Sequence, residues 1–185
     1  MRELAGGCDR CAGPATPGHP CWPDPSPYAT TTACYDYRGP VAAAVVTAKL
    51  AGAHAGWAGL ASRLADRVVE HAPDVDAVTW VTTAARRRRR RGLDHAAILA
   101  AGVARGLGVP TVRGVEADDR RRRPDRFTAA RAFPGSNLLV VDDVLTTGAT
   151  AARVARALAG AGAGRLHLAV LARAGTHPLV GTPPD

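Results

Sequence analysis

Residues 138–150 carry the groups whose types and spacing could do chemistry. Four apolar residues lead into two adjacent carboxylates, Asp142 and Asp143, and a short segment of threonines with one glycine follows them. A helical pattern then begins. In an open α/β sheet, ligands bind at the carboxyl ends of the strands. The order of residues therefore predicts a ligand site where this strand ends.

Segment 146–150 has the composition of a phosphate site. It lies where a helix begins, so backbone N–H groups and the helix dipole favour an anion there. The threonine hydroxyls add donors, and Gly148 lets the backbone approach a ligand closely. Asp142 and Asp143 would repel phosphate; they suit the hydroxyls of a neighbouring diol, or a divalent cation. A phosphate beside a diol describes a ribose 5-phosphate. The alternative is a helix cap with solvated acids, which accounts for one Asp and one Thr but not for the whole order.

The elements that must position this segment alternate between strand and helix. We expect strands at 33–37, 75–83, 111–115, 138–141 and 166–171, and helices at 41–50, 57–70, 93–107 and 149–158. Residues 116–131 are highly charged and contain Pro124, so we expect a loop there. The alternation predicts an α/β fold with an open, mostly parallel sheet flanked by helices.

Residues 1–27 differ in composition from the rest of the chain. They hold three of the four cysteines and six prolines, without hydrophobic periodicity. We expect a Cys- and Pro-rich N-terminal segment at 1–27 and one α/β domain at 28–185. Since no apolar stretch could span a membrane or serve as a signal peptide, we expect a cytoplasmic protein without structural disulfides and without membrane insertion.

Charge and composition exclude several classes of function. Lys49 is the only lysine among 24 basic residues, and it does not lie in the Gly-Lys-Ser/Thr context of a Walker loop. A Schiff-base enzyme would have only Lys49 to use. The net charge of +8 attracts polyanions such as nucleic acid or phosphorylated small molecules, although a mutational bias towards Arg and Ala is the alternative explanation.

The order of residues 138–150 closely resembles the motif with which type I phosphoribosyltransferases bind phosphoribosyl diphosphate (PRPP). By this resemblance, Asp142 and Asp143 hold the ribose hydroxyls and are the catalytic acids, and 146–150 hold the 5-phosphate. The implied PRPP-binding set is Asp142, Asp143, Val144, Leu145, Thr146, Thr147, Gly148, Ala149 and Thr150. The resemblance implies a type I phosphoribosyltransferase-like fold.

Three further segments are similar to the ComF family of phosphoribosyltransferase-like proteins, which is associated with DNA uptake in competent bacteria. They are Tyr-Arg-Gly-Pro at 37–40 followed by Lys49, Arg-Gly-Leu-Asp-His at 91–95, and Leu-Ala-Arg at 171–173. With the PRPP motif, they span most of residues 28–173.

The resemblance implies a glycosyltransferase reaction in which diphosphate is displaced at the ribose C1. The leaving diphosphate needs cations, namely Mg²⁺ and nearby basic groups. The candidate diphosphate contacts are Thr83, Ala84, Arg91 and Lys49. A solvated charge run is the alternative for 86–91, and a helix-surface position is the alternative for Lys49. For His95, a structural role is the more common one.

The family often begins with a zinc-binding Cys-x2-Cys…Cys-x2-Cys segment. Here Cys8, Cys11 and Cys21 are present, and Asp24 stands where the fourth cysteine should be, with His19 nearby. Three thiolates with one carboxylate are uncommon in structural zinc sites, which favours a finger that has lost its metal. Cys34 lies in an expected strand, and we expect it to be buried.

Three functions remain in competition. The first is transfer of phosphoribosyl from PRPP, with Mg²⁺, to an acceptor that the sequence does not name. The second is a non-catalytic sensor of PRPP or a nucleotide, which is favoured because 116–126 lacks the Gln usual in the family. The third is a DNA-uptake accessory that contacts DNA through the arginines of 86–91 and 120–123. A homodimer is one option for the quaternary state.

Overall fold

The computed structural model describes residues 7–51, 54–71, 74–82, 94–117, 127–175 and 179. Its main sheet has four strands in the order β1-β6-β5-β2, and every neighbouring pair is parallel. The strands are β1 (Thr30–Asp36), β2 (Ala77–Trp80), β5 (Leu138–Leu145) and β6 (Leu166–Arg173). The predicted α/β fold with a parallel sheet is therefore confirmed, and β5 is a central strand.

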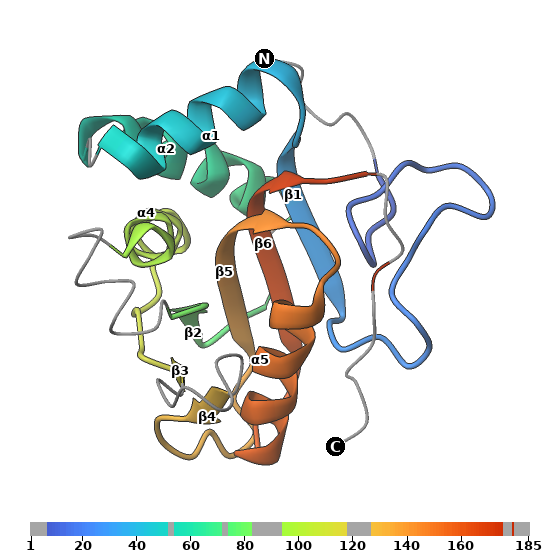
Figure 1. Cartoon of the computed structure of the whole chain (residues 1–185). Coiled ribbons are helices and arrows are strands. Elements are labelled where there is room, and N and C mark those ends of the chain that lie inside the picture. The colour runs from blue at the N-terminus through green and yellow to red at the C-terminus, as the bar shows by residue number, and fades with distance from the viewer. Residues whose placement is uncertain are drawn as a thin grey trace.

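Helices cover both faces of this sheet (Figure 1). They are α1 (Gly39–Ala51), α2 (His54–His71), α4 (His95–Leu107) and α5 (Ala149–Gly160). Residues of β5 alternate between the two cores, as strand geometry requires. Leu139 and Val141 belong to the core of α1, α2 and α4, and Leu138 and Val140 to the core of α5.

The Ala-rich composition lets helices approach one another closely. A Cβ atom placed on Gly102 of α4 would lie 2.7 Å from the Cβ of Ala61 of α2. One on Gly106 would lie 3.1 Å from the Cβ of Ala65. This core is therefore built from small residues at close backbone distance, and it needs few aromatic side chains.

Two expected elements differ from the structure. The expected strand at 111–115 is wrong: Thr111 makes an isolated bridge to Val78, and β3 (Val115–Ala117) begins where that strand was to end. The expected loop over 116–131 is wrong at both ends, because β3 pairs antiparallel with β4 (Phe127–Ala129). Strands of three residues have too little periodicity to stand out from a charged sequence. Residues 118–126 lie outside the described residues.

Residues 7–27 form neither helix nor strand of the named elements, yet they are fastened to the sheet beside β1 (Figure 1). Thr31 of β1 donates its N–H to the carbonyl of Asp9 (2.7 Å) and its hydroxyl to the carbonyl of Arg10 (2.7 Å). Cys11 and Trp22 are buried within the core of α5. None of the described helices is long and apolar enough to cross a bilayer.

Candidate functional site

The turn between β5 and α5 has the geometry of an anion site. β5 continues to Leu145, past the expected end at residue 141, because Asp142 and Val144 still pair with β6. Gly148 is the N-cap of α5 with φ of 78°, and no side chain caps the helix. Thr146, Thr147 and Thr150 are exposed around the buried Gly148. The N–H of Ala149 reaches Oγ1 of Thr147 at a long 3.4 Å, and the N-terminal end of α5, with its dipole, faces the turn where an anion would bind.

The two carboxylates lie at the end of β5 with a cation beside them. Lys49, from the last turn of α1, places its Nζ 2.7 Å from Oδ2 of Asp143. Their side chains are only 25% and 18% exposed, so solvent screens this pair less than a surface pair. The N–H of Asp143 donates to Oδ1 of Asp142 at 2.8 Å. The structure thus brings Lys49, from a helix early in the chain, to the adjacent pair Asp142 and Asp143.

Burial and neighbouring charge act on Asp142. Burial raises the pKa of Asp142 well above its ordinary value, and the charges of Asp143 and Asp94 raise it further. The N–H of Asp143 and the charge of Lys49 oppose this shift. Burial and the charge of Asp142 also raise the pKa of Tyr28. A bound cation or a hydroxyl donor would stabilise the ionised form of a carboxylate in these surroundings.

The raised pKa of Asp142 has a consequence for stability. Below the ordinary aspartate pKa, folded and unfolded chains both bind the proton, so the wild type keeps its full stability there. As the pH rises through the raised pKa of the folded state, that stability is lost. We expect Asp142→Asn to melt about 3 °C above the wild type near pH 8, roughly 1 kcal/mol, and no higher near pH 4. Calorimetric melting across this pH range measures it; a variant less stable at every pH would contradict the burial argument.

A third acid, Asp94, lies next to this pair. It precedes α4, and its Oδ2 accepts a hydrogen bond from Nε1 of Trp80 at 3.2 Å. Its buried Oδ1 accepts no hydrogen bond from the part of the chain that the structure describes. His95 stacks on the ring of Trp57, with centroids 4.5 Å apart, which agrees with a structural role. The candidate contacts Thr83, Ala84 and Arg91 lie outside the described residues.

A second group of side chains could hold a metal ion. Cys8, Cys11, His19 and Cys21, called here the Cys–His cluster, place their ligand atoms within 4.8 Å of one another. Sγ of Cys8 and Sγ of Cys21 are 3.9 Å apart. Two sulfurs bound to one tetrahedral zinc at about 2.3 Å would be about 3.8 Å apart. The donor set therefore fits tetrahedral zinc.

The backbone around the Cys–His cluster orients its ligands. Nδ1–H of His19 donates to the carbonyl of Thr16 at 2.9 Å, which turns the other ring nitrogen, Nε2, towards Sγ of Cys11 at 3.2 Å. The N–H of Gly13 donates to Sγ of Cys11 at 3.3 Å. Gly13 must be small, since a Cβ there would lie 3.0 Å from this sulfur.

The structure places Asp24, the expected fourth ligand, outside the Cys–His cluster. Its side chain is 92% exposed and pairs with Arg10 at 3.6 Å. His19 lies at the fourth position of the cluster instead. The reason is that the turn after Thr16 brings His19 back over Cys11, whereas the spacing of a zinc finger points to position 24. Cys34 is buried, as expected, and all four cysteines are free.

Only some of the residues that connect these two sites could be identified from the sequence. His19 was visible as a histidine between cysteines. Trp22 had no such signal, and Arg173 was noted only as part of the Leu-Ala-Arg segment at 171–173. Trp22 is 3% exposed, and Arg173 is 1% exposed although it carries a charge. An arginine buried this deeply marks a set of carbonyl acceptors, which only the folded chain reveals.

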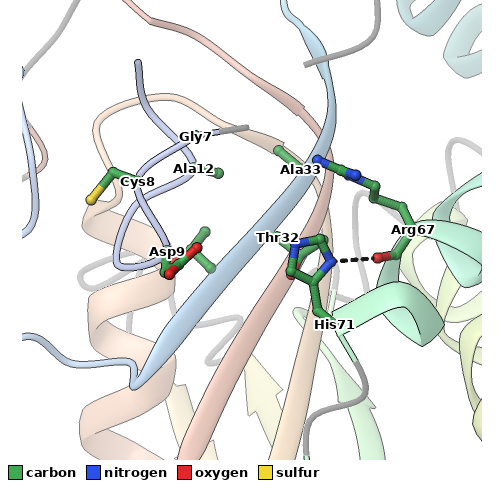
Figure 2. Close-up of a pocket in the computed structure, with 9 residues that line it drawn as sticks. Gly7, Cys8, Asp9, Ala12, Thr32, Ala33, Arg67 and His71 are labelled. Atoms are coloured by element: carbon green, nitrogen blue, oxygen red, sulfur yellow. Dashed lines mark hydrogen bonds between the residues drawn. The ribbon is translucent and has the colours of Figure 1, made fainter. Parts of the chain in front are cut away.

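A small polar hollow lies between the Cys–His cluster and α2 (Figure 2). Its lining residues are Gly7, Cys8, Asp9, Ala12, Thr31, Thr32, Ala33, Arg67 and His71. Nδ1–H of His71 donates to the carbonyl of Arg67 at 2.8 Å, as the dashed line shows. No lining residue belongs to the β5–α5 turn, so this hollow is separate from the carboxylate site.

Known proteins share the pattern of this chain. Residues 89–180 match the model of the phosphoribosyl transferase domain. The DNA utilization protein YhgH of Salmonella typhi is 27% identical over 198 residues, which cover 94% of this chain and 86% of YhgH. Both similarities support the resemblance to ComF-like phosphoribosyltransferase proteins that the sequence predicted. The matched domain agrees with the phosphoribosyltransferase-like fold predicted from the sequence.

Two solved structures are similar to this chain over part of its length. The glutamine phosphoribosylpyrophosphate amidotransferase of B. subtilis is 23% identical, with 63% of this chain and 26% of that chain covered and a TM-score of 0.48. The purine phosphoribosyltransferase of Pyrococcus horikoshii is 16% identical, with 69% and 90% covered and a TM-score of 0.45. This chain spans about a quarter of the amidotransferase.

Proposed function

We propose that this chain binds PRPP with Mg²⁺ at the end of β5 and transfers the phosphoribosyl group with release of diphosphate. One structural observation is the main support for this proposal. A carboxylate pair at the carboxyl end of a central strand is followed, after a short turn, by a helix N-terminus whose N-cap is Gly148, with exposed threonines around this buried glycine. Acceptors for a diol and donors for a phosphate are thus adjacent, as ribose 5-phosphate requires.

Each group has a distinct task in this proposal. Asp142 and Asp143 accept hydrogen bonds from the ribose hydroxyls and fix the orientation of the ring. The N–H groups and hydroxyls of 146–150 hold the 5-phosphate, so that C1 is presented to the acceptor. Mg²⁺, when bound, would neutralise the charge that develops on the leaving diphosphate. The three acids Asp94, Asp142 and Asp143, with Lys49 as the one described cation paired to them, give the site a charge that suits such an ion.

Calorimetric titration of PRPP with Mg²⁺ into the purified chain tests the binding step. A panel of bases and amines, assayed for diphosphate release, tests the transfer step. Binding with release supports the enzyme, whereas binding without release across the panel supports the alternative of a non-catalytic sensor. A folded chain that does not bind PRPP contradicts both.

Lys49 is expected to contribute to ligand affinity. Its ammonium group lies next to the carboxylates and within the proposed site. Hydrogen bonds to charged groups are worth about 1.5–3 kcal/mol, so we expect Lys49→Gln to weaken PRPP binding about tenfold or more. Lys49→Arg keeps the charge and should retain most of the affinity. Equal PRPP affinity of Lys49→Gln and the wild type would contradict this prediction and favour the alternative, in which Lys49 is only a helix-surface residue.

The similarity to YhgH supports a link to DNA utilization as a second candidate. That name belongs to the relative, and we propose for this chain a contact with DNA phosphates through the arginines of 86–91 and 120–123, which lie outside the described residues. Such binding would weaken steeply with salt. Measurement of affinity for single- and double-stranded DNA across salt concentrations tests it; a salt-independent or absent interaction would leave only the PRPP site.

We also propose that the Cys–His cluster binds zinc, contrary to the expectation of a finger without metal. Three thiols and one imidazole are a common donor set for structural zinc, and the Cys8–Cys21 sulfur distance of 3.9 Å suits a tetrahedral ion. Thiolates of this kind persist in a reducing compartment such as the cytoplasm.

Metal analysis should find about one zinc per chain. We expect His19→Ala to lower zinc affinity at least about tenfold, because it removes one of four ligands. Asp24→Ala should leave zinc affinity unchanged, since Asp24 lies outside the cluster. Zinc loss in the Asp24 variant, with retention in the His19 variant, would reverse this assignment.

A further inference from the structure

Trp22 connects the Cys–His cluster to the β5–α5 turn. It follows Cys21 directly, and its ring lies against Gly148: a Cβ atom on Gly148 would be 2.5 Å from both Cη2 and Cζ3 of Trp22. Nε1 of Trp22 donates to the hydroxyl of Thr31 at 3.2 Å, so the ring is held from behind by β1. The wall behind the proposed phosphate site is therefore a side chain of the metal-binding segment.

Arg173 makes a second connection at the end of β6. Its Nε donates to the carbonyl of Cys11 at 3.0 Å, its Nη2 reaches the carbonyl of Pro20 at 3.5 Å, and its Nη1 donates to its neighbour Ala174. The N–H of Ala174 in turn donates to the carbonyl of Leu145, the last residue of β5 (2.9 Å). The backbone on both sides of the Cys–His cluster is thus tied to the strand that carries the acids.

Tyr28 makes a third connection. Its hydroxyl donates to the carbonyl of Ala151, in the first turn of α5, at 2.7 Å. Its ring lies 5.9 Å from that of Trp22. Residues 7–28 therefore contact the turn and the helix after it, and they are linked to the strand before it through Arg173 and Ala174.

We propose that metal loading of the Cys–His cluster sets the affinity of the β5–α5 turn for its phosphorylated ligand, with Trp22 as the positioning residue. This inference rests on the function proposed above. Residues 7–27 contain no named helix or strand, so a metal bound by four of their side chains would fix their shape. Without the metal, Cys21 is no longer held in place, and neither is Trp22, the next residue in the chain. Without the Trp22 ring packed against it, Gly148 is free to leave its left-handed conformation, and the β5–α5 turn can change shape.

The coupling works in both directions, because a change in ligand affinity caused by the metal requires an equal change in metal affinity caused by the ligand. A phosphorylated ligand that holds the turn in place would hold Trp22, and through it Cys21. Binding of a phosphorylated ligand to the β5–α5 turn should therefore slow the release of zinc from the Cys–His cluster.

The first test compares the zinc-loaded wild type with the same protein stripped by a chelator. Far-UV circular dichroism follows the fold of both. We expect the stripped protein to bind PRPP with Mg²⁺ about tenfold more weakly, within the range typical of coupled sites. Full affinity after stripping would overturn the coupling while leaving the proposed function intact. Absence of binding in the zinc-loaded protein would overturn both.

The second test measures zinc release to a colorimetric chelator, with ribose 5-phosphate as the probe. In the wild type, saturating ribose 5-phosphate should slow release several-fold. In Trp22→Ala this protection should disappear although zinc is still bound at the start, and Trp22→Phe, which keeps a ring against Gly148, should restore it. Protection in Trp22→Ala equal to the wild type would overturn the role of Trp22. If Trp22→Ala does not fold, the comparison of Trp22→Phe with Trp22→Leu decides: equal protection in these two variants counts against it.

Discussion

Asp142→Asn combined with Asp143→Asn should abolish PRPP binding and leave the fold intact. Each carboxylate is expected to accept a hydrogen bond from a ribose hydroxyl, and bonds to charged groups contribute about 1.5–3 kcal/mol each. Loss of both therefore predicts a Kd about 100-fold higher or more. The fold should survive because Asn keeps the volume of Asp, and an amide oxygen at 142 can still accept the N–H of residue 143. Calorimetric titration with Mg²⁺ present measures the change.

Asp74→Asn with Asp76→Asn is the matched control. These two acids are exposed and lie before β2, at the opposite edge of the sheet from the carboxylate site. The control changes the net charge by the same amount without touching the end of β5. We expect it to bind PRPP as the wild type does. Equal losses in both double variants would mean that bulk charge, rather than the carboxylate pair, governs affinity.

Gly148→Ala should weaken both ligand binding and stability. Gly148 has φ of 78°, a conformation that costs a residue with a side chain roughly 1–2 kcal/mol. Its new Cβ would also lie 2.5 Å from the Trp22 ring and 3.2 Å from Cδ2 of Leu179, so the turn or the ring must move. We expect a melting temperature several degrees lower. We expect PRPP affinity to fall at least about tenfold, because the 5-phosphate would lose its aligned N–H groups. Thermal melting and titration measure the two effects.

Gly135→Ala separates backbone strain from steric conflict. Gly135 also has a positive φ, 69°, but a Cβ there would meet no atom within 4 Å. It lies before β5, away from the carboxylate site. This variant should lose stability and keep its PRPP affinity. Normal affinity in Gly148→Ala would show that the turn does not hold the phosphate, and Trp22→Ala added to Gly148→Ala should recover part of the lost stability if the ring causes the conflict.

The end of β5 could be predicted from the sequence because its information is local. An apolar run, two acids and a glycine before a helical pattern lie within 13 residues, and each has a physical reason for its place. The residue at which β5 ends was harder to predict from the sequence. Asp142 and Val144 remain in the sheet because β6 supplies their partners, and a pairing between segments far apart in the chain has no local signature.

The contact between Lys49 and Asp143 shows the same limit. Lys49 was a candidate because it is the only lysine of the chain, but its partner Asp143 depends on how α1 packs over the sheet. Asp94 was noted only beside His95, and its proximity to Asp142 follows from the alignment of β2 with β5. Sequence reasoning identified these residues, and the fold determined which of them meet.

The N-terminal segment was the hardest to predict, since its structure does not arise from periodicity. Its burial depends on single side chains such as Cys11 and Trp22, which enter the core of α5. The expected fourth ligand was derived from spacing, whereas the choice of His19 depends on a turn and on one carbonyl, that of Thr16. Irregular segments of this kind are specified by their contacts with the rest of the molecule, and those contacts are non-local.

The order of strands in the sheet has a consequence for how the chain folds. β1 pairs with β6, so that Thr30 meets His167, 137 positions later, and Cys11 meets Arg173 across 162 positions. On a ribosome, the cysteines emerge first and the surface that receives them is completed last. Contacts of such long sequence separation form slowly. A metal ion captured early by Cys8, Cys11, His19 and Cys21 would keep this first segment compact during synthesis, until β6 emerges and the segment can dock.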